Sequence, residues 1–288
     1  MNHKLGAHVS IGGGYHNAVQ KIKEMEGNTL QIFSSSPRGW SFAKPEESAI
    51  ELFKNLKKEN KIDPVYFHAS YLINLGTDER LGQVSRSSLK HELNLASRMG
   101  VKGSIVHLGS FKYDKDLDMT GYDVSKEMKY SALINNISEV LKDTPENTIF
   151  MIENAGTRKI GRTIEEIAQI IKDVNHPRLR VCLDTCHLHA AGYDITTKDK
   201  LDAFLEKFDS LIGLQKLELW HVNDSKDPYG SLRDRHENIG EGMVGIDTFR
   251  GLLNHPQLKD MSFIIETPGF DDKGPDKQNL DILKGLVE

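Results

Sequence analysis

The stretch "RVCLDTCHLHAAGYD", residues 180–194, begins as a buried strand would and then changes character. Small apolar residues lead up to Leu183, and the next four positions present an Asp, a Thr, a Cys and a His. Polar groups are costly in a core unless they have partners. In a barrel of parallel strands, however, the carboxyl ends of the strands form the floor of the active site. The stretch therefore predicts a strand that ends at Asp184 because it has reached the mouth of a barrel.

The same pattern of apolar run, polar loop and amphipathic segment recurs along the whole chain. The apolar runs that we interpret as strands are residues 4–10, 29–35, 64–70, 103–110, 148–154, 180–185, 217–224 and 262–267. Segments with helical periodicity include residues 18–25, 47–60, 87–100, 128–143, 163–174 and 201–213. Because strands and helices alternate without a linker or a change of composition, they predict parallel βα units that close on themselves.

The predicted fold class is therefore α/β, with residues 1–288 forming a single (β/α)8 TIM barrel domain whose active site lies at the C-terminal ends of the strands. An open, doubly wound sheet is the alternative. Eight βα units fit an open sheet less well than a closed barrel. An open sheet of this kind would also carry a glycine-rich, dinucleotide-binding loop after the first strand. The sequence "SIGGG" at residues 10–14 lacks the spacing of such a loop.

Composition and charge exclude several classes of protein. The net charge is −5 and no basic block stands out, which argues against a protein that coats nucleic acid by charge alone. Cys182 and Cys186 are too few for a disulfide framework, so we expect buried, reduced thiols. The first 17 residues hold no signal-like apolar segment, and no apolar run approaches the roughly 20 residues that cross a bilayer. We expect a cytoplasmic protein with no membrane partner.

Chemically active side chains stand at or next to the ends of six predicted strands. These residues are His68, His107, Glu153, Asp184, His221 and Glu266. Period-two alternation gives several of them the same face as apolar neighbours, such as Met151 before Glu153 and Ile264 before Glu266, so they point inward. Carboxylates brought together in this way repel one another unless positive charge lies among them, and no Lys or Arg occupies these strand ends. A metal centre is the simplest source of that charge.

Imidazole and carboxylate ligands without cysteine suit zinc, with manganese or iron as alternatives. Each residue also has a structural interpretation when it is taken singly. A lone histidine at a strand end, such as His8 or His68, is more often hydrogen-bonded than metal-bound. The pairs Asp184 with His187 and Asp234 with His236 fit a solvated loop equally well. The convergence of the whole set favours metal.

Three longer motifs carry a resemblance to a known family. The sequences "HASYLIN" (68–74), "RVCLDTCH" (180–187) and "WHVNDSKDPYGSLRDRH" (220–236) resemble motifs of the endonuclease IV family of apurinic/apyrimidinic endonucleases, and the spacing agrees across nearly the whole chain. The resemblance implies a xylose isomerase-like TIM barrel with three zinc ions. It further implies an enzyme that hydrolyses the phosphodiester 5′ to abasic sites in duplex DNA and leaves a 3′-hydroxyl and a 5′-deoxyribose phosphate.

The resemblance also assigns the ligands of each metal. The first metal would be held by His68, His107 and Glu153, the second by Glu153, Asp184, His221 and Glu266, and the third by His187, Asp234 and His236. Glu153 would bridge two metals and is the predicted catalytic residue. Two cations about 3.5–4 Å apart can activate water and clamp the attacking and leaving oxygens of an in-line displacement at phosphorus. The third can neutralise the phosphate.

The resemblance places DNA recognition in the loops after the strands. It implies that Arg38, Tyr71 and Leu72 insert into the base stack at the lesion. An abasic nucleotide flips out at low energetic cost because it has no base to unpair or unstack. Tyr71 and Leu72 could instead begin a helix and pack under the loop. Lys226 is a further candidate for phosphate contact. Many family members have Lys-Asn where this chain has Ser35-Ser36, so a phosphate contact is expected to be weaker here or supplied elsewhere.

Two other classes of function remain open beside the DNA repair endonuclease. Sugar isomerases and epimerases share this barrel and use metal, but they need only one or two ions, so the additional His187, Asp234 and His236 group argues against them. A barrel that binds without catalysis is disfavoured because every predicted ligand is present. We expect a monomer.

Overall fold

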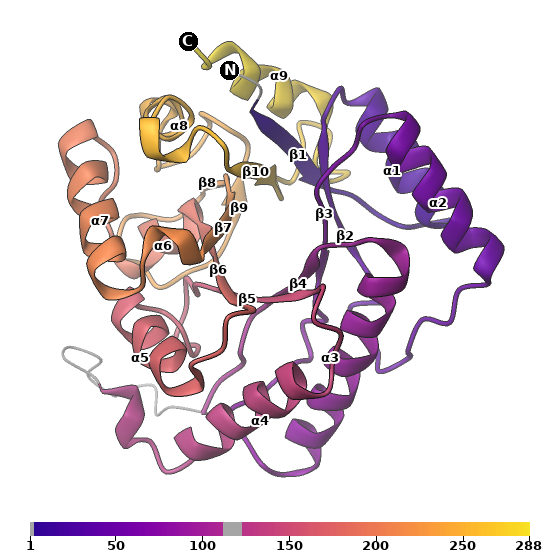
Figure 1. Cartoon of the computed structure of the whole chain (residues 1–288). Coiled ribbons are helices and arrows are strands. Elements are labelled where there is room, and N and C mark those ends of the chain that lie inside the picture. The colour runs from indigo at the N-terminus through magenta and orange to yellow at the C-terminus, as the bar shows by residue number, and fades with distance from the viewer. Residues whose placement is uncertain (1–2, 112–122) are drawn as a thin grey trace.

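Eight parallel strands close into a barrel in the computed structural model, which describes residues 3–111 and 123–288. In order around the ring they are β1 (Lys4–His8), β2 (Thr29–Phe33), β3 (Val65–His68), β4 (Gly103–Val106), β5 (Ile149–Glu153), β6 (Leu179–Asp184), β7 (Leu217–His221) and β10 (Ser262–Ile265). β10 pairs with β1 and so completes the circle (Figure 1). The eight predicted runs cover these strands except for one residue at the start of β6. The alternative of an open, doubly wound sheet is wrong.

Helices surround this barrel. Those that the structure describes are α1 (Tyr15–Glu24), α2 (Glu47–Glu59), α3 (Arg80–Met99), α4 (Tyr130–Lys142), α5 (Ile164–Val174), α6 (Thr185–Ala191), α7 (Lys198–Leu211), α8 (Ile246–Leu253) and α9 (Lys277–Gly285). Short 3₁₀ turns lie at Val124–Lys126, Leu214–Lys216 and Pro256–Leu258, and a small hairpin pairs β8 (Asp224–Ser225) with β9 (His236–Glu237). The six predicted helical segments coincide with α1 to α5 and α7. None of these described helices is both long and apolar enough to cross a membrane.

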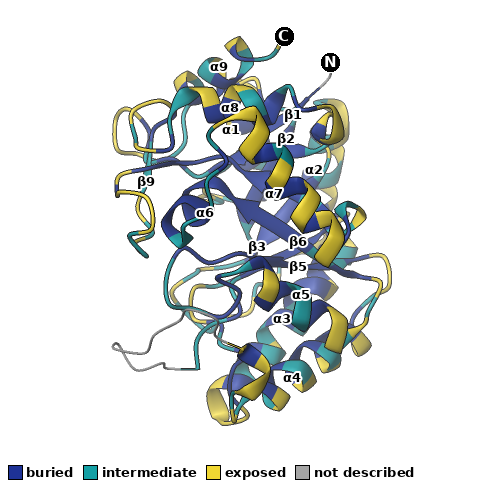
Figure 2. Cartoon of the chain, turned by 90° about the vertical axis from the view of Figure 1, so that its left-hand side faces the viewer, coloured by how far each residue is buried: buried dark blue, intermediate teal, exposed yellow. Residues whose placement is uncertain are grey.

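The barrel separates two apolar regions. The larger one lies between the strands and the helices, which turn their exposed faces outward (Figure 2). The smaller one fills the barrel interior with the side chains of Tyr66, Ile105, Met151, Cys182, Leu219 and Ile264. Both cysteines of the chain are buried and unpaired.

The interior layer explains where the polar strand ends point. Two positions after each of its six members, on the same face of the same strand or its continuation, stands one of the predicted ligands. In the order of the layer these are His68, His107, Glu153, Asp184, His221 and Glu266. The alternation that fills the barrel with apolar side chains therefore delivers six metal-type side chains to its mouth.

Candidate metal centre

Nine side chains gather at the mouth in three groups, and within each group the potential ligand atoms lie within 4.8 Å of one another. The groups are His68, His107 and Glu153; Glu153, Asp184, His221 and Glu266; and His187, Asp234 and His236. These are the three sets that the family resemblance implies. Asp184, Cys186 and His236 form a further overlapping group. The geometry thus brings all nine residues together, and their binding of metal remains a prediction.

Glu153 lies at the centre of the cluster and is fully buried. Its Oε2 atom is 3.1 Å from His68 Nε2 and 3.2 Å from His107 Nε2. Its Oε1 atom is 3.0 Å from His221 Nδ1 and 3.4 Å from His187 Nδ1. Burial opposes ionisation, but the imidazoles of His107 and His221 outweigh it and hold the pKa of Glu153 well below its usual value. The two carboxylate oxygens therefore serve two different groups of the site.

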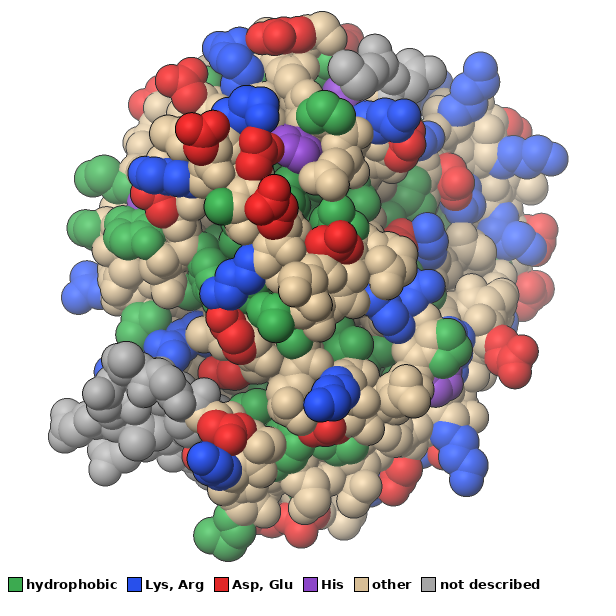
Figure 3. All heavy atoms as spheres, turned by 60° about the vertical axis from the view of Figure 1, so that its left-hand side comes forward, with side chains coloured by type: hydrophobic (Ala, Val, Ile, Leu, Met, Phe, Trp, Pro, Cys, Tyr) green, Lys and Arg blue, Asp and Glu red, His purple; other side chains and the backbone are tan. Residues whose placement is uncertain are grey.

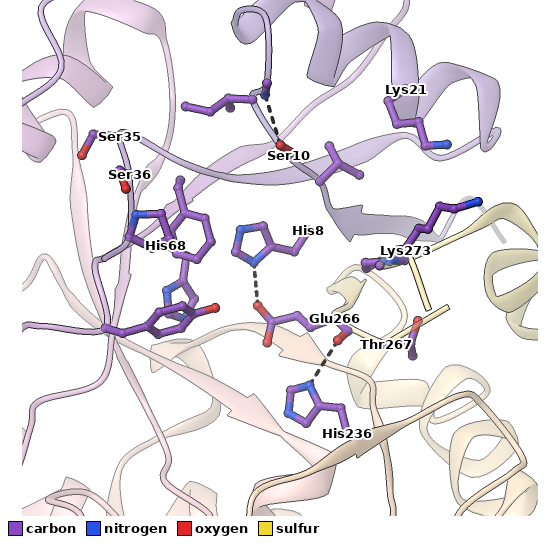
Figure 4. Close-up of a pocket in the computed structure, with 18 of the residues that line it drawn as sticks. His8, Ser10, Lys21, Ser35, Ser36, His68, His236, Glu266, Thr267 and Lys273 are labelled. Carbon is purple, nitrogen blue, oxygen red and sulfur yellow. Dashed lines mark hydrogen bonds and ion pairs between the residues drawn. The ribbon is translucent and has the colours of Figure 1, made fainter. Parts of the chain in front are cut away.

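Main-chain carbonyl groups determine which ring nitrogen carries the proton in two histidines, His187 and His236. His187 Nδ1 lies 2.9 Å from the carbonyl oxygen of Asn154. His236 Nδ1 lies 3.2 Å from that of Glu266 (Figure 4). A carbonyl oxygen only accepts, so each Nδ1 must donate, and in a neutral ring Nε2 then carries the lone pair. These Nε2 atoms lie 3.1 and 3.3 Å from Asp234 Oδ1, yet both are buried without a hydrogen bond among the described residues.

His68 repeats this arrangement on the other side of the site. Its Nδ1 donates to the carbonyl oxygen of Ala69 at 2.8 Å, which turns Nε2 toward the Glu153 carboxylate. A lone pair that faces a carboxylate is repelled unless a second proton or a cation lies between them. Burial opposes the second proton, but the nearby carboxylates raise the pKa of His68 and of His236 to about 9.

The donor set fits divalent metal ions. Imidazoles whose other nitrogen donates to a carbonyl group are the usual form of metal-bound histidine, and the partner atoms fix the ring orientation. Neutral imidazole together with carboxylate is a donor set of zinc sites, and manganese and iron accept the same ligands. The buried lone pairs and carboxylates at this mouth are thus arranged as they would be around cations.

Asp184 is held by two features that were not predicted. Its Oδ1 atom accepts from the backbone N–H of His187 at 3.0 Å and so caps α6, which begins at the next residue. Its Oδ2 atom accepts from Asn223 Nδ2 at 2.7 Å. Asn223 stands two positions beyond His221, so the same alternation could have identified it. Gln31, a further polar side chain of the site that was not predicted, stands in the otherwise largely apolar strand β2.

A cavity of about 930 Å³ opens above the cluster. Ser35 and Ser36 border one side of it, and Lys21 and Lys273 border the other (Figure 4). Tyr71 also lines it and is 62% exposed, with its ring centre 5.4 Å from that of Phe33. The site therefore has an acidic and imidazole-rich floor, two lysines at its rim and an exposed aromatic ring.

The structure places the other predicted DNA-binding residues on exposed loops. Arg38 follows β2 and is exposed, and Leu72 is 36% exposed next to Tyr71. Tyr71 and Leu72 lie in a turn, and α3 begins only at Arg80, so the interpretation that they begin a helix is wrong. Lys226 lies on the hairpin connection with its Nζ atom 3.7 Å from Glu237 Oε2, and it is not among the described residues that line the cavity.

Comparisons with known proteins agree with this geometry. Residues 19–286 match the sequence profile of the xylose isomerase-like TIM barrel family. A Thermosipho africanus protein named "Probable endonuclease 4" is 38% identical over 282 residues, which cover 93% of this chain and 94% of that protein. A protein of the same name from Halothermothrix orenii is 38% identical over 284 residues, covering 98% and 99%.

Solved structures extend the comparison. The crystal structure of endonuclease IV from Thermus thermophilus matches with a TM-score of 0.83 and 31% identity, and the match covers 98% of each chain. A D-tagatose 3-epimerase-like protein matches with a TM-score of 0.72 but only 19% identity, covering 98% of this chain and 96% of that one. The second match shows a shared fold alone.

Proposed function

The chain belongs to the endonuclease IV family of xylose isomerase-like TIM barrels, and from that premise we propose that it is a DNA repair nuclease. The proposed reaction is hydrolysis of the phosphodiester 5′ to an abasic site in duplex DNA, leaving a 3′-hydroxyl and a 5′-deoxyribose phosphate. The observation that carries the proposal is the position of the Glu153 carboxylate between two sets of imidazoles. One of its oxygens faces His68 and His107, and the other faces His221 and His187.

We propose three metal ions per chain, mainly zinc, with manganese or iron as alternatives at one or more sites. Bound divalent ions would supply the positive charge that activates water and stabilises an in-line displacement at phosphorus. Glu153 would keep two of the sites at a fixed separation. Sugar isomerases and epimerases need only one or two metal sites. The third group, formed by His187, Asp234 and His236, therefore supports a nuclease.

The approach of DNA is proposed to depend on the mouth of the barrel. On the face that Figure 3 shows, lysine and arginine side chains are interspersed with aspartate and glutamate. Lys21 and Lys273 border the cavity itself, where a phosphate backbone would meet positive charge. The net charge of −5 is therefore compatible with binding of DNA at this one place.

We also propose that the chain acts as one domain, as a monomer and in the cytoplasm. Support for one domain comes from the barrel itself, because β1 begins at Lys4, α9 ends at Gly285, and β10 pairs with β1. The proposed substrate, DNA, is found inside cells, which supports the expected location.

The proposed function is tested on a duplex oligonucleotide with one tetrahydrofuran abasic analogue. This analogue cannot form a Schiff base or undergo β-elimination, so only hydrolysis can cut beside it. We expect a cut 5′ to the analogue without added magnesium, and a 3′ end that a DNA polymerase extends. The control is the same duplex with an intact base.

Two outcomes would contradict the proposed function. One is cleavage confined to natural abasic sites, with a protein–DNA adduct that borohydride traps. The other is failure to cut abasic DNA combined with metal-dependent epimerisation of a free sugar, which would assign the chain to the sugar enzymes that share its fold.

Tyr71 and Arg38 are predicted to act on the DNA and not on the chemistry. Loss of the exposed Tyr71 ring in Tyr71→Ala should weaken binding to abasic duplex by about 1–3 kcal/mol, or roughly 5- to 150-fold in Kd, the range for an aromatic that stacks on a base. Arg38→Ala should weaken the same binding. Hydrolysis of bis-p-nitrophenyl phosphate, which needs no DNA deformation, should change little.

Arg250→Ala on α8 is a suitable control, because its side chain is 45% exposed on an outer helix. This control should change neither Kd nor hydrolysis. Equal losses on the duplex and on the small phosphodiester would show that Tyr71 and Arg38 support the metal centre instead.

A further inference from the structure

Gln31 lies fully buried at the mouth of the barrel, on β2, a strand that supplies none of the nine predicted ligands. Its carboxamide contacts two of those ligands directly. The Nε2 atom is 2.5 Å from Glu266 Oε1, and the Oε1 atom is 2.7 Å from His221 Nε2. Glu266 follows β10 and His221 ends β7, so one side chain joins three elements of the barrel.

The orientation of this carboxamide follows from its neighbours. An ionised carboxylate only accepts hydrogen bonds, so the NH₂ group of Gln31 must face Glu266 and its oxygen must face His221. The oxygen in turn only accepts, so His221 Nε2 must donate. In the neutral ring, His221 Nδ1 then carries the lone pair. Gln31 thereby determines the tautomer of His221.

That lone pair points at the predicted second metal position. His221 Nδ1 lies 3.0 Å from Glu153 Oε1, 3.4 Å from Glu266 Oε2 and 3.8 Å from Asp184 Oδ2. These atoms belong to the four side chains that form one of the metal-type groups. The arrangement presents a nitrogen lone pair and three carboxylate oxygens to one common point.

Glu266 is oriented by the same contact. Its Oε1 atom accepts from Gln31 and also lies 2.9 Å from His8 Nδ1, which donates to it in the tautomer that carries the proton on Nδ1 (Figure 4). Gln31 Nε2 is itself 2.9 Å from the same His8 nitrogen. With Oε1 engaged by Gln31 and next to His8, Oε2 is left to face His221 and the centre of the group. His8 therefore has the structural role expected of it, as a partner of a proposed ligand.

We propose that Gln31 is a positioning residue for the second metal site. Its carboxamide fixes the His221 tautomer and engages one oxygen of Glu266, so that His221 Nδ1 and Glu266 Oε2 are directed at the same ion. The proposal rests on the proposed function, because it concerns the metal centre of that function. Partners of this kind, which hold metal ligands by hydrogen bonds, are typically worth about 10- to 100-fold in metal affinity.

The first test is Gln31→Met, which conserves volume and removes both the donor and the acceptor. The control is Thr29→Val on the same strand, where the hydroxyl group donates only to the Pro64 carbonyl oxygen and lies outside the metal-type groups. Zinc content is measured after dialysis against a graded series of chelator concentrations, with the melting temperature of each metal-free protein as a check of folding. We expect one of three zinc ions to bind about 10- to 100-fold more weakly in Gln31→Met, and unchanged binding in Thr29→Val.

The outcomes are distinguishable. Equal zinc affinities in wild type and Gln31→Met would overturn the role of Gln31 while leaving the proposed function intact. A wild-type protein that retains no divalent ion would instead defeat the proposed function.

A second test needs no variant and therefore holds even if Gln31→Met does not fold. Nitrogen-15 NMR of the zinc-loaded wild-type protein reports which ring nitrogen of His221 carries the proton. We expect the proton on Nε2 and none on Nδ1. A proton on Nδ1 would overturn the proposal, because the carboxamide of Gln31 would then not determine the tautomer.

Discussion

Glu153→Gln is expected to lower abasic-site cleavage by about 10³-fold or more, a loss at the upper end of those seen when one group that stabilises a transition state is removed. Among the three predicted ligand sets, Glu153 is the side chain that belongs to two of them. An amide keeps its shape but removes the negative charge, and its NH₂ group would turn a donor toward either the His68 side or the His221 side. Neither side can then hold a cation in the same way.

Glu92→Gln provides a matched control for this variant. Glu92 is also a buried glutamate, but it lies on α3 and accepts from the hydroxyl groups of Ser34 and Ser104. Burial raises the pKa of Glu92, whereas the imidazoles lower that of Glu153. An amide should therefore be tolerated at position 92. The measurement is kcat on the tetrahydrofuran duplex, with zinc content and melting temperature for both variants.

The interpretation of Glu153 would be wrong if Glu153→Gln kept more than about a tenth of wild-type activity, since a one-charge change at a bridging ligand costs more than this. It would also be wrong if Glu92→Gln lost as much activity as Glu153→Gln. In that case any buried carboxylate, and not the bridging position, would be the source of the loss.

The sequence was most informative where periodicity and strand ends coincide. Met151 and Glu153 show why: an apolar residue inside the barrel predicts that the residue two positions later faces the same way at the mouth. Because parallel strands end at the same rim, strands that are far apart in the sequence could be predicted to contribute to one cluster. The fold and the six strand-end residues follow from these two rules.

Contacts across the ring could not be obtained in this way. Gln31 and Glu266 are 235 positions apart, and only the closure of β1 between β2 and β10 brings them within a hydrogen bond. The cap of α6 by Asp184 is a local contact, but it requires a helix to begin directly at the end of strand β6. The run of polar residues at 184–187 gave no sign of that helix. Strand order and turn geometry, which decide these contacts, leave little trace in periodicity.

Complete removal of metal is expected to lower the melting temperature by about 10 °C or more. A ligand held at about 1,000 times its Kd stabilises the folded protein by about 4 kcal/mol, and each kcal/mol corresponds to roughly 2–4 °C for a chain of 150–250 residues. Without cations, the four carboxylates and the inward-facing imidazole lone pairs share one mouth, and Glu153, Asp184 and His221 among them are fully buried. Their mutual repulsion opposes the closed barrel.

Differential scanning calorimetry before and after chelation tests this expectation, with elemental analysis to verify that the metal has been removed. A chelator already saturated with zinc is the control, and it should leave the melting temperature unchanged. Adding zinc back should restore both the melting temperature and the cleavage of abasic DNA, since the same nine side chains are proposed to carry stability and activity. A metal-free protein that melts at the wild-type temperature would show that the cluster is satisfied by protons alone, as the raised pKa values of His68 and His236 would permit.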